Sequence, residues 1–155
     1  MGNRALVAFT SQGRSPAFAI YLHWNGGPES VYAFLDYCKA VGVREDDSYQ
    51  AARFCQVVGN YLGGTLSLGI VSVDLRAADP DCAGCDNGIY VVRGWKVEKR
   101  WRGDRGRWLT EEEISDEYAR AYAHAYHKAG SDKNIVAAIA RANDAAFRPA
   151  TEAAP

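Results

Sequence analysis

The sequence has no long apolar run and almost no net charge, and each absence removes a class of protein. No window approaches the roughly 18 apolar residues of a membrane-spanning helix, and the N-terminus lacks the apolar stretch of a signal peptide. We therefore expect a cytoplasmic protein without membrane contact. The formal net charge of −1 gives no overall attraction to nucleic acids or anionic lipids, so an anionic partner would need a local basic patch.

Cysteine is also scarce, with four residues in 155. Without a secretory signal, cytosolic reductants favour free thiols over a disulfide framework. Cys82 and Cys85 have the spacing of half a zinc site, but a structural zinc needs two further ligands, and the sequence offers no second close pair. Cys38 and Cys55 fall on apolar helix faces, as buried thiols do. We predict no cofactor, and the spacing alone leaves a metal role for Cys82 and Cys85 open.

The N-terminal part of the chain has the pattern of a β-hairpin. Residues 3–10 and 17–24 are rich in β-branched, aliphatic and aromatic side chains, and a turn-rich segment separates them. In the second strand, period-two alternation predicts that Trp24 faces the core and that Tyr21 and His23 face the other way.

Two helices are predicted after the hairpin. Apolar residues recur at three- and four-residue spacing over residues 28–41 and again up to residue 62. Pro28 suits the first position of a helix, because its missing N–H would have had no partner there. The second helix is expected to begin near Asp46–Ser48 and to stop at Gly63.

Two more helices are predicted near the C-terminus. Thr110 and Glu113 have the spacing of a capping box, in which each side chain binds the backbone N–H of the other residue. The helix that begins there is expected to reach about Lys128. Ser131 can cap a last helix.

The order of these elements predicts the fold class. Residues 65–73, 89–92 and 95–102 are β-rich and add about three strands to the hairpin. Because strands and helices do not alternate, we predict an α+β fold, with a mainly antiparallel sheet of about five strands covered by about four helices. Residues 1–148 are predicted to form one domain, followed by a disordered tail, 149–155.

The first candidate site lies where a strand passes through glycines into a helix. Free N–H groups at a helix start carry partial positive charge, and glycine lets an anion approach the backbone closely. We predict a phosphate or carboxylate site with contacts from Tyr21, His23, Asn25, Gly26 and Gly27. The alternative is an ordinary strand-to-helix turn, because the spacing matches neither a Walker loop nor a dinucleotide-binding fingerprint.

The second candidate site is a basic segment. Residues 93–107 carry seven basic and two acidic side chains with tryptophans between them, which suits phosphate contact and base stacking. The predicted ligand contacts are Arg93, Lys96 and Arg100. The alternative is a solvated outer strand, in which alternation turns Trp95, Val97 and Trp101 toward the core and Arg100 toward water.

Three short segments resemble uncharacterised proteins encoded by phages, prophages and other mobile elements. They are residues 1–5 (MGNRA), 21–27 (YLHWNGG) and 86–90 (DNGIY). The resemblance covers about the first two thirds of the chain, and the C-terminal helices fall outside it. It implies an accessory protein that tunes host processes or counters host defence, and some proteins of this kind sequester nucleotide immune signals.

Together these features favour a non-enzymatic binding protein. We expect a homo-oligomer that holds a small phosphorylated ligand such as a nucleotide signal. Two alternatives remain open. One is an inhibitor that binds a host defence protein or a nucleoprotein complex through its surface. The other is a small nucleotide hydrolase or lyase that uses His23 as acid or base, although the sequence contains neither GxSxG nor HExxH.

Overall fold

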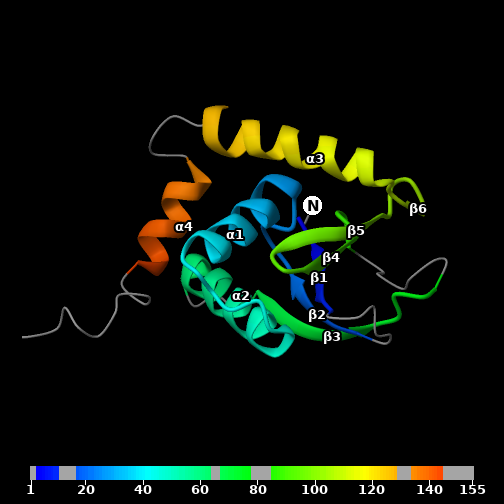
Figure 1. Cartoon of the computed structure of the whole chain (residues 1–155), viewed down its shortest axis with the longest axis horizontal. Helices are drawn as coiled ribbons and strands as arrows, with labels where there is room; N and C mark the ends of the chain where they lie inside the picture. Colours follow the sequence, from blue (N-terminus) through cyan, green and yellow to red (C-terminus); the bar gives the residue numbers. More distant parts are fainter. Residues whose placement is uncertain (1–2, 11–16, 64–66, 78–84, 129–133, 145–155) are drawn as a thin grey trace, which may run out of the picture.

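A mixed six-stranded sheet with helices packed against it forms the protein (Figure 1). The computed structural model describes residues 3–10, 17–63, 67–77, 85–128 and 134–144. The predicted α+β class is confirmed. Three predictions lie outside the described residues: the cap Ser131, the thiol Cys82 and the disordered tail 149–155.

The sheet has the strand order β3-β2-β1-β4-β5-β6. Its strands are β1 (Ala5–Phe9), β2 (Ala17–Leu22), β3 (Leu68–Val73), β4 (Ile89–Arg93), β5 (Lys96–Arg102) and β6 (Arg107–Trp108). β1 and β4 are parallel and the other neighbours are antiparallel, so the prediction of a mainly antiparallel sheet is confirmed. The strand beyond the predicted five is the short β6, which pairs with the end of β5.

The helices begin where local signals predict. They are α1 (Pro28–Ala40), α2 (Asp47–Leu62), α3 (Glu111–Ala123), the π-helix η1 (His124–Lys128) and α4 (Ile135–Asn143). Pro28 occupies the first position of α1, and Thr110 and Glu113 form both bonds of the capping box of α3. The predicted single helix up to Lys128 instead changes to a π-helix at His124. The cap of α4 is Asn134, whose side-chain oxygen accepts from two backbone N–H groups.

All described helices pack on one face of the sheet. Their apolar faces form one core with alternate strand residues such as Val7, Leu22 and Tyr90. The intervening strand residues, including Ile89 and Trp101, form a second, smaller core on the opposite face. Helices α1 and α3 pack against each other, and Figure 1 shows α3 lying along the upper side of the molecule. No helix in the described ranges combines the length and apolar content needed to cross a bilayer.

A bulge in β5 reverses two predicted orientations. Val97 and Lys99 pair with consecutive residues of β4, so Glu98 is an extra residue on its strand. Because side chains alternate along a strand, one inserted residue moves every later side chain to the other face. Trp101 therefore packs in the second core, and Arg100 is fully buried toward the helices. The predicted faces of both residues were wrong.

The predicted burial of Trp24 was also wrong. Its side chain is 46% exposed. The alternation that predicts burial stops with β2 at Leu22, and Asn25 then turns the chain with a φ of 59°. Trp24 instead contacts His23, with ring centroids 4.9 Å apart.

Candidate functional site

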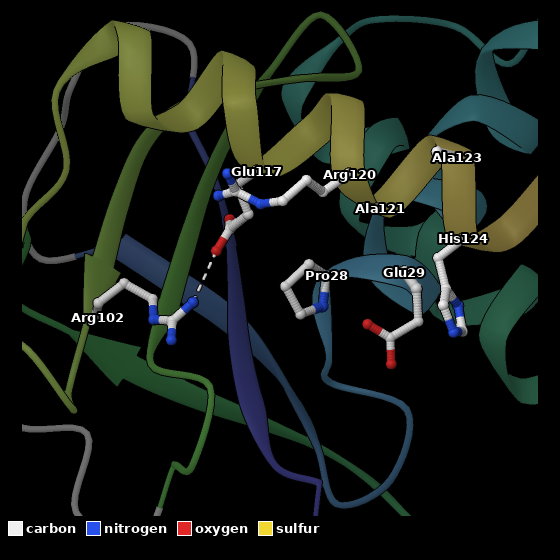
Figure 2. Close-up of a pocket in the computed structure, with 8 residues that line it drawn as sticks. All are labelled: Pro28, Glu29, Arg102, Glu117, Arg120, Ala121, Ala123 and His124. Atoms are coloured by element: carbon white, nitrogen blue, oxygen red, sulfur yellow. Dashed lines mark hydrogen bonds and ion pairs between the residues drawn. The ribbon is translucent and has the colours of Figure 1, made fainter.

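A cavity of about 480 Å³ lies beside the start of α1 (Figure 2). We call it the α1-start cavity. Its polar or charged lining side chains come from four elements, and Figure 2 shows Arg102, Glu117 and Arg120 on one side of Pro28 and Glu29 and His124 on the other. They are Glu29 from α1, Arg102 from β5, and Glu117, Arg120 and His124 from α3 and the following π-helix.

Some backbone N–H groups at the start of α1 already have hydrogen-bond acceptors. The N–H groups of Ser30 and Val31 donate to the carbonyl of Gly27, the N-cap residue. No side chain caps this helix. The Glu29 carboxylate folds back toward the cap, since a Cβ at Gly27 would lie 2.9 Å from its Oε1. An internal anion therefore sits close to the positive end of the helix dipole.

Gly26 is required for packing. A Cβ built on it would lie 2.7 Å from the Cβ of Ala5, and its N–H donates to the Asn3 carbonyl at 2.7 Å. The hydroxyl of buried Tyr90 donates to the Gly26 carbonyl at 3.0 Å. These contacts fix the direction in which α1 leaves the sheet.

Arg102 is held in place on the β5 side of the cavity. Its Nη2 lies 2.7 Å from Oδ2 of Asp104, and its Nη1 lies 3.0 Å from Oε1 of Glu117. The hydrogen bond with Asp104 is the main reason that the pKa of Arg102 is raised. Burial lowers this pKa, and the hydrogen bond with Glu117 raises it again. Arg102 therefore presents a fixed positive charge whose donors are largely occupied.

Behind Glu117 lies a buried charged network. Arg100 donates from Nε to Oε2 of Glu117 at 2.9 Å and from Nη1 to the carbonyl of Trp101 at 2.7 Å. Its guanidinium carbon lies 3.7 Å from the centroid of the Tyr90 ring, and the Tyr32 hydroxyl donates to the same Glu117 oxygen at 3.3 Å. The Arg100 Nη2 atom is buried and has no partner among the described groups.

Arg120 and His124 differ from these residues because their side chains have no hydrogen bond or ion pair within the described ranges. Both line the α1-start cavity, and in Figure 2 the Arg120 side chain extends toward Glu117 while the His124 ring lies beside Glu29. His124 is also the first residue of the π-helix, a widened turn that occurs often at functional sites. Their nitrogen donors are therefore free to contact a ligand.

The residues predicted for the first candidate site lie outside this cavity. The Tyr21 hydroxyl lies 3.1 Å from Nδ1 of His23, and Tyr21 packs against the core on the helix-free face of the sheet. Asn25 is positioned by its side chain, which donates to Ser30 Oγ at 3.4 Å. None of the five predicted residues lines the cavity; Gly27, the cap of α1, directly precedes the lining residue Pro28.

The predicted contacts of the basic segment are also dispersed. Arg93 pairs with Glu98 at 3.6 Å beside the β4–β5 turn, and Arg100 is buried behind Glu117. Lys96 lines a second cavity of about 440 Å³ near the end of α1. Since a strand rises about 3.3 Å per residue, Lys96 and Arg102 stand roughly 20 Å apart at opposite ends of β5.

Sequence patterns missed the residues that converge on the α1-start cavity. Arg102 belongs to the recognised basic segment, but Arg120 and His124 lie on a helical segment whose most regular sequence feature is the four-residue spacing of Tyr118, Tyr122 and Tyr126. Comparisons of the chain with family models, curated proteins and solved structures gave no match. Among the residues that the structure describes, no cluster of three or more His, Cys, Asp or Glu side chains could hold a metal.

Proposed function

We propose that the protein binds a small phosphorylated ligand in the α1-start cavity and does not transform it. The observation that carries this proposal is the Arg120 guanidinium, which has no hydrogen bond or ion pair with any described residue and lines the same cavity as the start of α1. A guanidinium matches two phosphate oxygens at once, and a helix start adds backbone donors and partial positive charge.

The charges around the cavity favour one added anion. Arg100 and Arg102 are balanced by Glu117 and Asp104, and Arg120 and Glu29 add one charge of each sign, so displacement of Glu29 leaves one positive charge for a ligand. Glu29 is the internal anion nearest the helix start. A phosphate would displace the Glu29 side chain and accept hydrogen bonds from the Glu29 N–H, Arg120 and His124, because Pro28 has no N–H and those of Ser30 and Val31 already donate to Gly27. Hydrogen bonds to charged groups contribute about 1.5–3 kcal/mol each.

Binding without turnover fits the described lining of the cavity. It offers no serine, threonine or cysteine nucleophile, and the carboxylate of Glu117 is already held by two arginines. His23, the predicted acid or base, is bonded to Tyr21 on another part of the surface. The resemblance to mobile-element proteins supplies a setting for the proposal, in which a homo-oligomeric accessory protein withdraws a nucleotide signal from host defence.

Calorimetry with inorganic phosphate, pyrophosphate, AMP and ATP tests the proposal. Arg120→Gln should weaken binding of the best ligand at least tenfold, because one charge-assisted hydrogen bond of about 1.5–3 kcal/mol is lost. Glu29→Gln should strengthen binding by removing the competing carboxylate. Arg141→Gln, at an exposed position of α4, is the matched control and should change nothing.

Three outcomes count against the proposal. No heat from any of these ligands at millimolar concentration, or equal affinity of the wild type and Arg120→Gln, contradicts binding in this cavity. Conversion of the ligand, followed by phosphorus NMR during the titration, contradicts binding without turnover. Recovery of a stoichiometric host protein by pull-down, with no ligand bound, favours the inhibitor alternative.

A further inference from the structure

The second cavity lies toward the other end of α1, between that helix, α3 and the start of β5. We call it the aromatic cavity. Its buried floor is formed by Tyr32, Trp95 and Ile114, which are 5%, 3% and 9% exposed. Trp95 Nε1 donates to the Val43 carbonyl at 2.9 Å, so the polar atom of the indole is satisfied. The floor is therefore apolar and aromatic, and because its residues are almost fully buried it presents only a narrow strip of surface to an occupant.

Four charged side chains surround this floor without pairing. They are two acids and two bases: Asp36, Glu111, Lys39 and Lys96. None of them forms an ion pair within the described part of the chain. Lys39, Lys96 and Glu111 are exposed, whereas Asp36 is partly buried, so an occupant that covers Asp36 removes water from a carboxylate and has to supply a positively charged donor.

The Asp36 carboxylate has unused hydrogen-bonding capacity. A single hydroxyl, that of Tyr118, donates to both carboxylate oxygens, at 3.3 and 3.2 Å. A carboxylate has about four acceptor positions, so most of its capacity is unused. Burial raises the pKa of Asp36, with opposing effects from Tyr118 and Lys39. An ammonium group beside Asp36 would supply the missing donors.

We propose that the aromatic cavity is a separate binding site for a free α-amino acid with a large apolar side chain. The ligand ammonium binds Asp36, the ligand carboxylate binds Lys96, and the apolar side chain packs on Trp95 and Ile114. The amino acid matches Asp36 and Lys96, while Glu111 and Lys39 stay exposed to water. A ligand with one charge matches only one of the two binding groups. A phosphate faces Asp36 and Glu111, and a simple amine faces Lys39 and Lys96.

Three probes that differ by one charged group test the assignment. Ligand-observed NMR and calorimetry are run with L-phenylalanine, phenethylamine, which lacks the carboxylate, and 3-phenylpropionate, which lacks the ammonium. L-phenylalanine should bind at least tenfold more tightly than either analogue. Equal or tighter binding of phenethylamine or of 3-phenylpropionate overturns the assignment, as does the absence of L-phenylalanine binding at millimolar concentration.

Variants identify which charged side chain of the protein binds which charged group of the ligand. Asp36→Asn should weaken L-phenylalanine and phenethylamine at least tenfold and should not weaken 3-phenylpropionate. Lys96→Met should remove the preference for L-phenylalanine over phenethylamine. Lys99→Met, an exposed lysine further along β5, is the matched control and should behave as the wild type. If Asp36→Asn is folded, as a cooperative urea transition would show, and still binds L-phenylalanine as tightly as the wild type, the proposal is overturned.

This site stands independently of the phosphate site. Inorganic phosphate at 100-fold excess over the probe should not displace L-phenylalanine. Displacement would show that both bind one cavity and would overturn the separate assignment. Loss of phosphate binding in Arg120→Gln with L-phenylalanine binding intact would support two sites.

Discussion

The two cavities that border α1 and α3 differ in how far their charged side chains form ion pairs. In the α1-start cavity, Arg102 pairs with Asp104 at 2.7 Å and with Glu117 at 3.0 Å, and Glu117 also binds buried Arg100. In the aromatic cavity, Asp36, Glu111, Lys39 and Lys96 surround an apolar floor without ion pairs among the described residues. Paired charges fix the β5 side of the first cavity and leave Arg120 for a ligand, whereas in the second cavity none of the four charges has an ion pair among the described residues. Equivalent substitutions in the two cavities should therefore have unequal effects.

The largest difference is expected when one carboxylate is removed from each cavity. Glu117→Gln leaves Arg100 buried without its counter-ion and should lower the free energy of unfolding by about 3–5 kcal/mol. Asp36→Asn removes an unpaired charge and should cost less than about 1 kcal/mol, the worth of its hydrogen bond to Tyr118. Urea denaturation of both variants measures the difference. Equal losses would contradict the distinction between paired and unpaired charges.

A smaller loss is expected from Tyr90→Phe, which tests how rigidly the α1-start cavity is built. The Tyr90 hydroxyl is buried and donates to the Gly26 carbonyl at 3.0 Å. Its removal leaves a buried acceptor without that donor, at a cost of about 2 kcal/mol. Tyr49→Phe, on the exposed surface, is the control and should stay within about 0.5 kcal/mol of the wild type. Indistinguishable urea midpoints for the two variants would show that the α1 start does not depend on this bond.

Thr110→Ala tests the cap of α3, the helix that both cavities share. The Thr110 Oγ1 accepts from the Glu113 N–H at 3.2 Å, and the Glu113 carboxylate accepts from the Thr110 N–H at 3.0 Å. Loss of a helix cap should cost about 1 kcal/mol. Thermal or urea unfolding measures this loss. Asp116→Ala, at an exposed position on the same helix, is the control. A larger loss for Asp116→Ala than for Thr110→Ala would refute the role of the cap.

The mildest perturbation is titration of Glu113. Its hydrogen bond with Arg107 is the main cause of a pKa lowered from 4.5 to about 2, followed by the bond from the Thr110 N–H. Because the folded value lies below the ordinary one, the stabilisation by Glu113 is complete above about pH 4.5 and is lost as pH falls toward 2. Carboxyl-carbon NMR should find a midpoint near 2, which Arg107→Gln raises. A midpoint of 4.5 in the wild type would mean that the Arg107 pair does not form in solution.

Local signals made much of the fold predictable. Pro28 at the start of α1, the box between Thr110 and Glu113, and Gly63 at the end of α2 each depend on a few neighbouring residues, and all three predictions are confirmed. The parallel pairing of β1 with β4 joins residues more than 80 positions apart, and no local pattern specifies such a contact.

The candidate sites were harder to predict for a related reason. The inserted Glu98 is invisible to a period-two pattern, yet it moves Arg100 from the predicted surface into the core. Arg120 and His124 reach the α1-start cavity only because α3 packs over α1. Sequence patterns found the uncapped helix start and the basic segment, whereas tertiary packing decides which cations face that start.

Backbone amide NMR during titration with inorganic phosphate tests the central claim most directly, because it reports both cavities at once. Our account predicts that the largest shift changes cluster at Glu29–Val31 and Arg120–His124, with little change at Trp95–Val97. Changes centred on Trp95–Val97, or no saturable change anywhere, would contradict the account.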